Sequence, residues 1–178
     1  VVSGGVEAGP GAAEYGDRLY LNDGKGGFTK AGPDILPPGT ASSSAAVAGD
    51  WDRDGDLDVF IGARSVPGRY PETPESRLLR NEGGRFVDVT DTVAPGLRTV
   101  GLVTGALWSD TEGDGDLDLL VAVEWGPVQL FRNQEGMLED ATAYAGLDRY
   151  AGWFNSITGS DVDEDGDIDY IVSNVGLN

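Results

Sequence analysis

Short apolar runs bounded by polar turn residues recur along the chain and predict its secondary structure. Such runs are typical of buried strands, and they occupy residues 59–62, 119–122 and 170–173. A segment of small residues precedes each run, at residues 45–49, 105–109 and 156–160, and an acidic stretch separates the two. The pattern therefore predicts pairs of strands joined by acidic loops.

A second hairpin follows the apolar runs. Residues 19–24, 78–83 and 130–136 each combine a strand with an Asn- and Gly-containing turn, where glycine supplies the positive φ that a tight hairpin needs. Phe28, Phe86 and Leu138 then open a further strand. Helical periodicity is weak, and only residues 93–97 and 141–147 are expected to form helical turns.

Each repeat thus predicts four strands in roughly 40 to 60 residues, which is typical of a four-stranded antiparallel β-propeller blade. We expect an all-β chain with a partial blade at residues 1–40, full blades at 41–98 and 99–148, and a partial blade at 149–178. Residues 1–4 match residues 59–62 and are expected to form a second strand. About three and a quarter blades do not close a ring of four to eight, so we expect part of a larger propeller.

The acidic stretches are three copies of one nonapeptide. Residues 50–58, 110–118 and 161–169 carry an acidic residue at every alternate position and glycine at the sixth, namely Gly55, Gly115 and Gly166. The carboxylates of such a loop repel one another unless a cation lies among them, which argues against a metal-free acidic turn. Calcium takes six to eight oxygen ligands, whereas magnesium prefers more water and transition metals prefer nitrogen or sulfur. The loops therefore predict calcium sites.

The candidate ligands are all the acidic residues at the alternate positions of the three loops. They are Asp50, Asp52, Asp54, Asp56, Asp58, Asp110, Glu112, Asp114, Asp116, Asp118, Asp161, Asp163, Asp165, Asp167 and Asp169. An EF-hand would need a glutamate at position 12 and flanking helices. Position 12 is instead Ile61, Val121 or Val172, so the EF-hand interpretation fails in every copy.

This pattern resembles the integrin-α type of repeat, also called FG-GAP or VCBS repeats. Residues 152–155 and 174–178 are also similar to bacterial secreted members related to cartilage acidic protein. The resemblance implies about three calcium ions, each held by side chains at loop positions 1, 3, 5 and 9. It implies a backbone carbonyl ligand at position 7, from Asp56, Asp116 and Asp167. Glu112 departs from the family's aspartate, which leaves open whether it coordinates directly.

Charge and composition exclude several classes of function. The 178 residues include 31 acidic and 12 basic ones, for a net charge of −19, which disfavours nucleic acid and anionic membranes as partners. No apolar stretch is long enough for membrane insertion. Histidine and cysteine are absent, which excludes Ser-His-Asp and Cys-His catalysis, and the clustered acids are assigned to metal. We therefore expect no enzyme.

The sequence is best explained as a calcium-stabilised extracellular or cell-surface module, of bacterial origin, that binds a protein or glycan. Millimolar extracellular calcium suits loops of modest affinity. Two alternatives stay open: a structural subunit that self-associates through open blade edges, and an accessory domain of a polysaccharide-degrading enzyme. Trp51, Trp108, Trp125 and Trp153 can pack between blades or stack on a glycan, and Trp51 is expected to be the most exposed.

Overall fold

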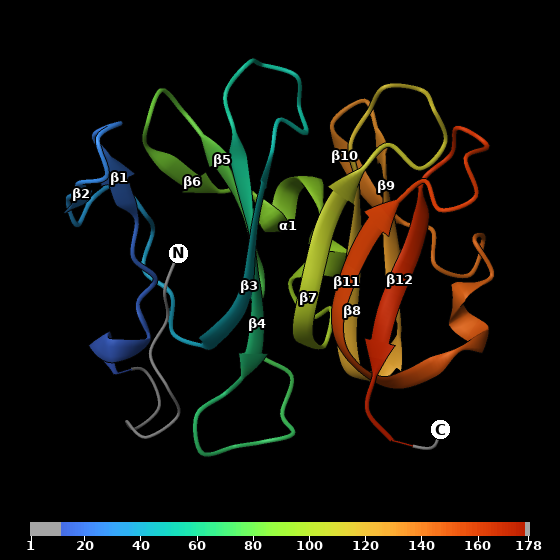
Figure 1. Cartoon of the computed structure of the whole chain (residues 1–178). Coiled ribbons are helices and arrows are strands. Elements are labelled where there is room, and N and C mark those ends of the chain that lie inside the picture. Colours follow the sequence, from blue (N-terminus) through green and yellow to red (C-terminus); the bar gives the residue numbers. More distant parts are fainter. Residues whose placement is uncertain (1–11, 177–178) are drawn as a thin grey trace.

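The chain folds into antiparallel β-sheets with very little helix (Figure 1). The computed structural model describes residues 12–176, so the prediction for residues 1–4 lies outside the described part of the chain. The all-β fold of partial propeller blades is confirmed. The blade boundaries themselves stay a prediction.

The first described sheet is a short hairpin. After a 3-10 turn, η1 (Ala13–Tyr15), strand β1 (Tyr20–Asn22) pairs with β2 (Phe28–Lys30). The Asp23 carboxylate closes the turn by accepting hydrogen bonds from the backbone N–H of Lys25 at 2.8 Å and of Gly27 at 2.9 Å. This hairpin is the third-strand and fourth-strand pair that the sequence predicts for the first repeat.

The second sheet is a complete four-stranded meander. Its strands are β3 (Ser42–Gly49), β4 (Asp58–Ser65), β5 (Arg77–Asn81) and β6 (Phe86–Asp88), paired in that order. A helical turn follows as α1 (Thr90–Val93) and η2 (Pro95–Leu97), where the sequence predicts one at residues 93–97. Most of β4 is buried, as expected for an apolar run inside a sheet.

The third sheet has six strands because one edge of β8 pairs first with β7 and then, further along, with β11. Strands β7 (Leu102–Ser109), β8 (Asp118–Pro127), β9 (Gln129–Gln134) and β10 (Met137–Asp140) form a second meander. After η3 (Leu147–Arg149), β11 (Ala151–Ser160) and β12 (Asp169–Asn174) form a hairpin. The start of β11 pairs with the end of β8, with Trp153 opposite Glu124. The sequence does not predict this connection between repeats.

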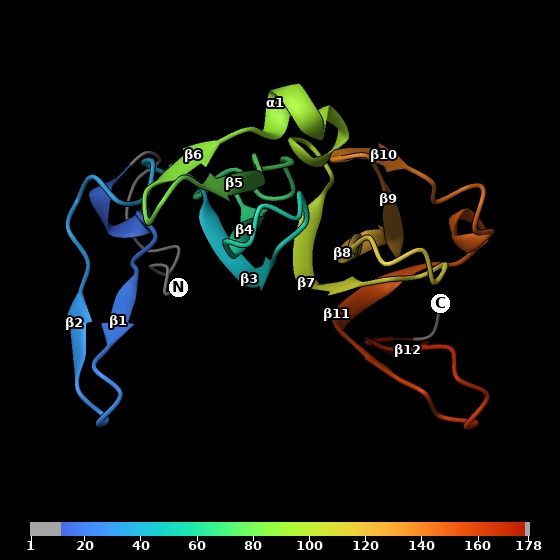
Figure 2. The ribbon, with the colours of Figure 1, turned by 90° about the horizontal axis from the view of Figure 1, so that it is seen from above.

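The sheets stand side by side along an arc, with β7 lying between β3 and β11 (Figure 2). One apolar core fills the space between the second and third sheets and includes Phe60, Leu78, Val103, Leu119 and Phe131. Small residues in the strands before the acidic loops allow this close approach. A Cβ at Gly49, for example, would lie 2.8 Å from the Trp108 ring.

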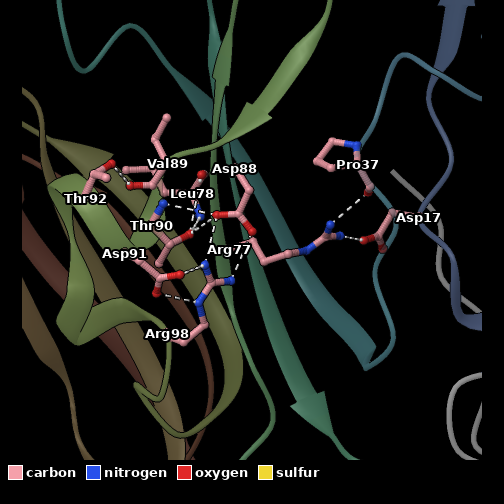
Figure 3. A network of polar contacts seen from close by, with 10 residues as sticks. All are labelled: Asp17, Pro37, Arg77, Leu78, Asp88, Val89, Thr90, Asp91, Thr92 and Arg98. Carbon is pink, nitrogen blue, oxygen red and sulfur yellow. Dashed lines mark hydrogen bonds and ion pairs between the residues drawn. The ribbon is translucent and has the colours of Figure 1, made fainter.

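A buried ion pair connects the segment before the first hairpin to the second sheet (Figure 3). Arg77 donates to the Asp17 carboxylate at 2.5 Å and to the Pro37 carbonyl at 2.9 Å. Arg98, which follows η2, donates to Asp88 of β6 at 3.0 Å and to Asp91 of α1 at 2.8 Å. Burial alone would raise the pKa of Asp88, but hydrogen bonds from Arg98 and Thr90 outweigh burial and lower it.

Candidate metal centres

The three acidic loops connect β3 to β4, β7 to β8 and β11 to β12, all at the same end of the sheets (Figure 1). Glycine at loop position 6 adopts positive φ in every copy, at 94° for Gly55, 88° for Gly115 and 100° for Gly166. This left-handed conformation turns the chain back on itself between the acidic residues.

The residue at loop position 4 is also left-handed, which was not predicted from the sequence pattern. Its φ is 59° at Arg53, 72° at Gly113 and 64° at Glu164. Two left-handed residues, two positions apart, therefore curl each loop. Only Gly113 carries a sequence signal for this, because arginine and glutamate rarely adopt positive φ and do so here within the loop context.

Backbone N–H groups orient two of the acidic side chains in the same way in each loop. The position-6 glycine donates to the position-1 aspartate, over 3.2 Å at Asp50, 2.8 Å at Asp110 and 3.1 Å at Asp161. The position-7 N–H donates to the position-5 aspartate, over 2.9 Å at Asp54, 2.9 Å at Asp114 and 3.0 Å at Asp165. These bonds make the side-chain arrangement of the loops a repeated structure.

The first loop brings three carboxylates together and leaves buried oxygens without partners. Asp50, Asp52 and Asp54 each place an oxygen within 4.8 Å of the others. Asp58 is fully buried, and its Oδ1 accepts from the Asn81 N–H at 2.8 Å. Its Oδ2, like Asp50 Oδ1, is buried and has no hydrogen-bond partner among the described residues.

Burial raises the pKa of Asp58 to about 6 and also raises the pKa of Asp52. A buried carboxylate oxygen without a partner destabilises the fold unless a cation or donor reaches it. The all-oxygen donor set of the first loop therefore fits a hard divalent cation such as calcium.

The third loop forms a similar group in a more exposed setting. Asp161, Asp163 and Asp169 each place an oxygen within 4.8 Å of the others. Asp169 accepts from the Val162 N–H at 3.1 Å. Asp165, the expected ligand at position 5, lies outside this group of three, as Asp58 lies outside the corresponding group in the first loop.

In the second loop, hydrogen-bond donors of the protein itself pair with the acidic side chains. Glu112 forms an ion pair with Arg132 of β9. Asp118 is buried, and both of its oxygens are hydrogen bonded: Oδ1 to the Asn133 N–H at 2.8 Å, and Oδ2 to the Thr111 hydroxyl at 2.5 Å. Burial alone would raise the pKa of Asp110, but hydrogen bonds from the Gly115 and Gly113 backbone N–H groups outweigh it and lower this pKa. Within residues 12–176, this loop gathers no comparable trio of acidic oxygens.

The remaining predicted ligands, Asp56, Asp116 and Asp167, are the position-7 residues. The side chains of Asp56 and Asp167 are exposed. Asp116 forms an ion pair with Arg53 of the neighbouring loop at 2.9 Å. This contact holds the first and second loops together and was not predicted from the sequence.

The expectation that Trp51 is the most exposed tryptophan is wrong. Only 2% of Trp51 is exposed, because it packs into the core between the second and third sheets. Its carbonyl accepts a hydrogen bond from the Asn133 side chain at 2.6 Å. Trp108 also packs between sheets, and its indole N–H donates to the Val47 carbonyl at 3.3 Å. The exposed tryptophan is Trp125, at 61%.

Antiparallel sheets joined at one end by repeated acidic loops define a repeat protein built of propeller blades. In a comparison with protein families, the model of the FG-GAP-like repeat matches residues 6–61 and 110–172, about two thirds of the chain. The chain belongs to the FG-GAP-like repeat family. No curated protein matches it. Within residues 12–176, no helix is long and apolar enough to span a bilayer.

Proposed function

We propose that the chain is a calcium-stabilised segment of an extracellular β-propeller that serves as a binding module for a protein or glycan. The observation that carries the calcium part is Asp58, which is fully buried with one carboxylate oxygen unpartnered among the described residues. Membership of the FG-GAP-like repeat family supports the same proposal.

Calcium at the loops would neutralise repulsion that the protein itself leaves uncompensated. Asp50, Asp52, Asp54 and Asp58 would hold one ion, and Asp161, Asp163, Asp165 and Asp169 another. The second loop would hold a third ion more weakly, because Glu112 is engaged by Arg132. At a free calcium concentration ten times the dissociation constant, each occupied site would stabilise the fold by about 1.4 kcal/mol.

Calorimetric titration of calcium into chelator-treated protein, with thermal melting in parallel, tests the proposal. We expect two tighter ions, a third weaker one and a rise in melting temperature with calcium. An unchanged melting temperature together with no heat of binding would overturn it.

Asp58→Asn provides a sharper test, because it removes both a ligand and a buried charge. The variant should melt at a higher temperature than the wild type in chelator and gain less from calcium. Asp118→Asn is the matched control. Since Asp118 already accepts hydrogen bonds on both oxygens, this change should lower the melting temperature in chelator.

A structural role is the second candidate, favoured by exposed apolar side chains on the outer hairpins. Tyr20, Leu21 and Phe28 are exposed on the first hairpin, and Ile171 is exposed on β12. Such strands offer edges for pairing with another copy. A solution mass that rises with protein concentration would support a subunit role, and a constant monomer mass would contradict it.

A further inference from the structure

A side chain of the first acidic loop reaches into the second loop. Arg53 is the position-4 residue of the first loop, and its Nε lies 2.9 Å from Asp116 Oδ1 in the second. The guanidinium also lies against Gly115, since a Cβ at that glycine would be 2.7 Å from Arg53 Nη2. Arg53 therefore contacts positions 6 and 7 of the second loop, where the chain turns.

The direction of the Arg53 side chain depends on the curl of the first loop. Arg53 lies between Asp52 and Asp54, which belong to the group of three carboxylates that this loop gathers. Its φ of 59° is left-handed, and the Asp54 N–H donates to the Asp52 carboxylate at 3.3 Å. Repulsion among these carboxylates favours an opened loop, which would carry the guanidinium away from the second loop.

Arg53 contacts the two residues whose backbone orients acidic side chains of the second loop. The Gly115 N–H donates to Asp110 at 2.8 Å, and the Asp116 N–H donates to Asp114 at 2.9 Å. A guanidinium that holds Gly115 and Asp116 in place therefore also holds the directions of these two carboxylates. The contact thus preorganises candidate ligands that Arg53 itself does not pair with.

The two arginines at the second loop act on different kinds of position. Arg132 pairs with Glu112 at position 3, which belongs to the acidic groups that both other loops gather. Arg53 pairs with Asp116 at position 7, which belongs to neither group. Arg132 therefore competes with an ion for a ligand, whereas Arg53 steadies the loop without occupying one.

The third loop shares the acidic pattern but not this contact. Position 4 of the second loop is Gly113, which has no side chain to extend toward a neighbour. Within residues 12–176, the ion pairs of the second loop go to Arg53 and Arg132, and none goes to the third loop. The third loop is therefore an internal control for any effect carried by Arg53.

We propose that Arg53 is a positioning residue that couples the first two loops, so that calcium in the first raises the calcium affinity of the second. Ordering Asp52 and Asp54 fixes the left-handed residue between them and keeps its guanidinium on the second loop. The expected coupling is about two- to fivefold, because the Arg53 side chain is 56% exposed and its ion pair is screened by solvent. The effect is reciprocal between the two loops. This inference rests on the proposed function, since it requires calcium at both loops.

The test is a calcium titration of isotope-labelled protein followed by NMR, in which the amide signals of Gly55, Gly115 and Gly166 report on the three loops separately. Asp50→Asn weakens the first site and keeps an acceptor for the Gly55 N–H. In this variant the Gly115 midpoint should move to about two- to fivefold higher calcium. In an Arg53→Gln background, the same Asp50→Asn change should leave the Gly115 midpoint where it was.

Arg132→Gln is the matched control, because it removes the other arginine from the second loop. In that background the Gly115 midpoint should still respond to Asp50→Asn, while the Gly166 midpoint should be the same in every variant. Equal Gly115 midpoints in wild type and Asp50→Asn, or a response to Asp50→Asn that persists in Arg53→Gln, would overturn the coupling alone. No response of any of the three glycines to calcium would overturn the calcium part of the proposed function and this inference with it.

Discussion

The first and second acidic loops share a sequence pattern but satisfy their carboxylates differently. In the first loop, Asp50 and Asp58 keep buried oxygens without partners among the described residues. In the second, Arg132 engages Glu112, and hydrogen bonds occupy both oxygens of Asp118. A shared motif therefore does not imply equal affinity for an ion, because neighbouring side chains decide which oxygens are available.

Loop position 2 contributes much of this difference. In the second loop it is Thr111, whose hydroxyl donates to Asp118 at 2.5 Å. In the first loop it is Trp51, which has no such donor and packs into the core instead. The third loop has Val162, which reaches Asp169 only through its backbone N–H at 3.1 Å.

The largest expected effect comes from replacing the position-2 residues, Trp51 and Thr111, with alanine. Trp51→Ala should lower the free energy of unfolding by about 3–5 kcal/mol, because it leaves a cavity between two sheets. Thr111→Ala should cost only about 1 kcal/mol and should strengthen calcium binding at the second loop, because it removes one of the two hydrogen bonds that Thr111 donates to Asp118 Oδ2 and keeps the one from its backbone N–H. Urea unfolding of both variants measures the comparison, and equal losses of stability would contradict it.

A carboxylate paired with arginine should stabilise the fold without calcium. Asp88, which lies outside the acidic loops, allows this to be tested. Asp88→Asn should lower the free energy of unfolding at pH 7 by about 1.5–3 kcal/mol, because it breaks the bonds to Arg98. The folded-state pKa of Asp88 is lowered below the usual value. Its contribution is therefore present above the unfolded-state pKa of about 3.9 and is lost as the pH falls through the folded-state pKa.

Unfolding in urea at pH 7, 5 and 3, with and without chelator, measures this effect. Asp91→Asn is the control: Asp91 contacts the same Arg98, but its side chain is 73% exposed, so we expect a loss below about 1 kcal/mol. A deficit of Asp88→Asn that grows toward pH 3, or that depends on calcium, would contradict the assignment.

The smallest expected effect is a change in the calcium affinity of the second loop. Arg132→Gln should release Glu112 and raise the calcium affinity of the second loop a few-fold, which corresponds to about 1 kcal/mol or less. Arg69→Gln is the control, because Arg69 pairs with Glu72 in the β4–β5 loop, at the end of the sheets opposite the acidic loops (Figure 1). A second-loop affinity that calorimetry finds unchanged in Arg132→Gln would show that Glu112 is not held back by this ion pair.

Local pattern was enough to predict the strands. Alternating small, acidic and apolar segments located the hairpins, and the recurring glycine, such as Gly55, located the turn within each loop. These features depend on neighbours in the chain, so a single sequence reveals them.

Contacts between repeats could not be predicted in the same way. The pairs Arg53–Asp116 and Glu112–Arg132, and the burial of Trp51, depend on which residues of different strands meet in space. Trp51 illustrates the limit: within its loop it appears solvent-facing, but the neighbouring sheet covers it. The contacts of Trp125 with Trp153 and Tyr70 likewise join three segments that the sequence does not place together.

The length of strand β8 determines which parts of the molecule unfold together. Its first part, Asp118–Glu124, pairs with β7, and its last part, Glu124–Pro127, pairs with β11. A unit that unfolds cooperatively includes whatever strands share hydrogen bonds, whether or not they belong to one repeat. The β11–β12 hairpin should therefore exchange its amide hydrogens together with strands β7–β10, while the β1–β2 hairpin exchanges independently.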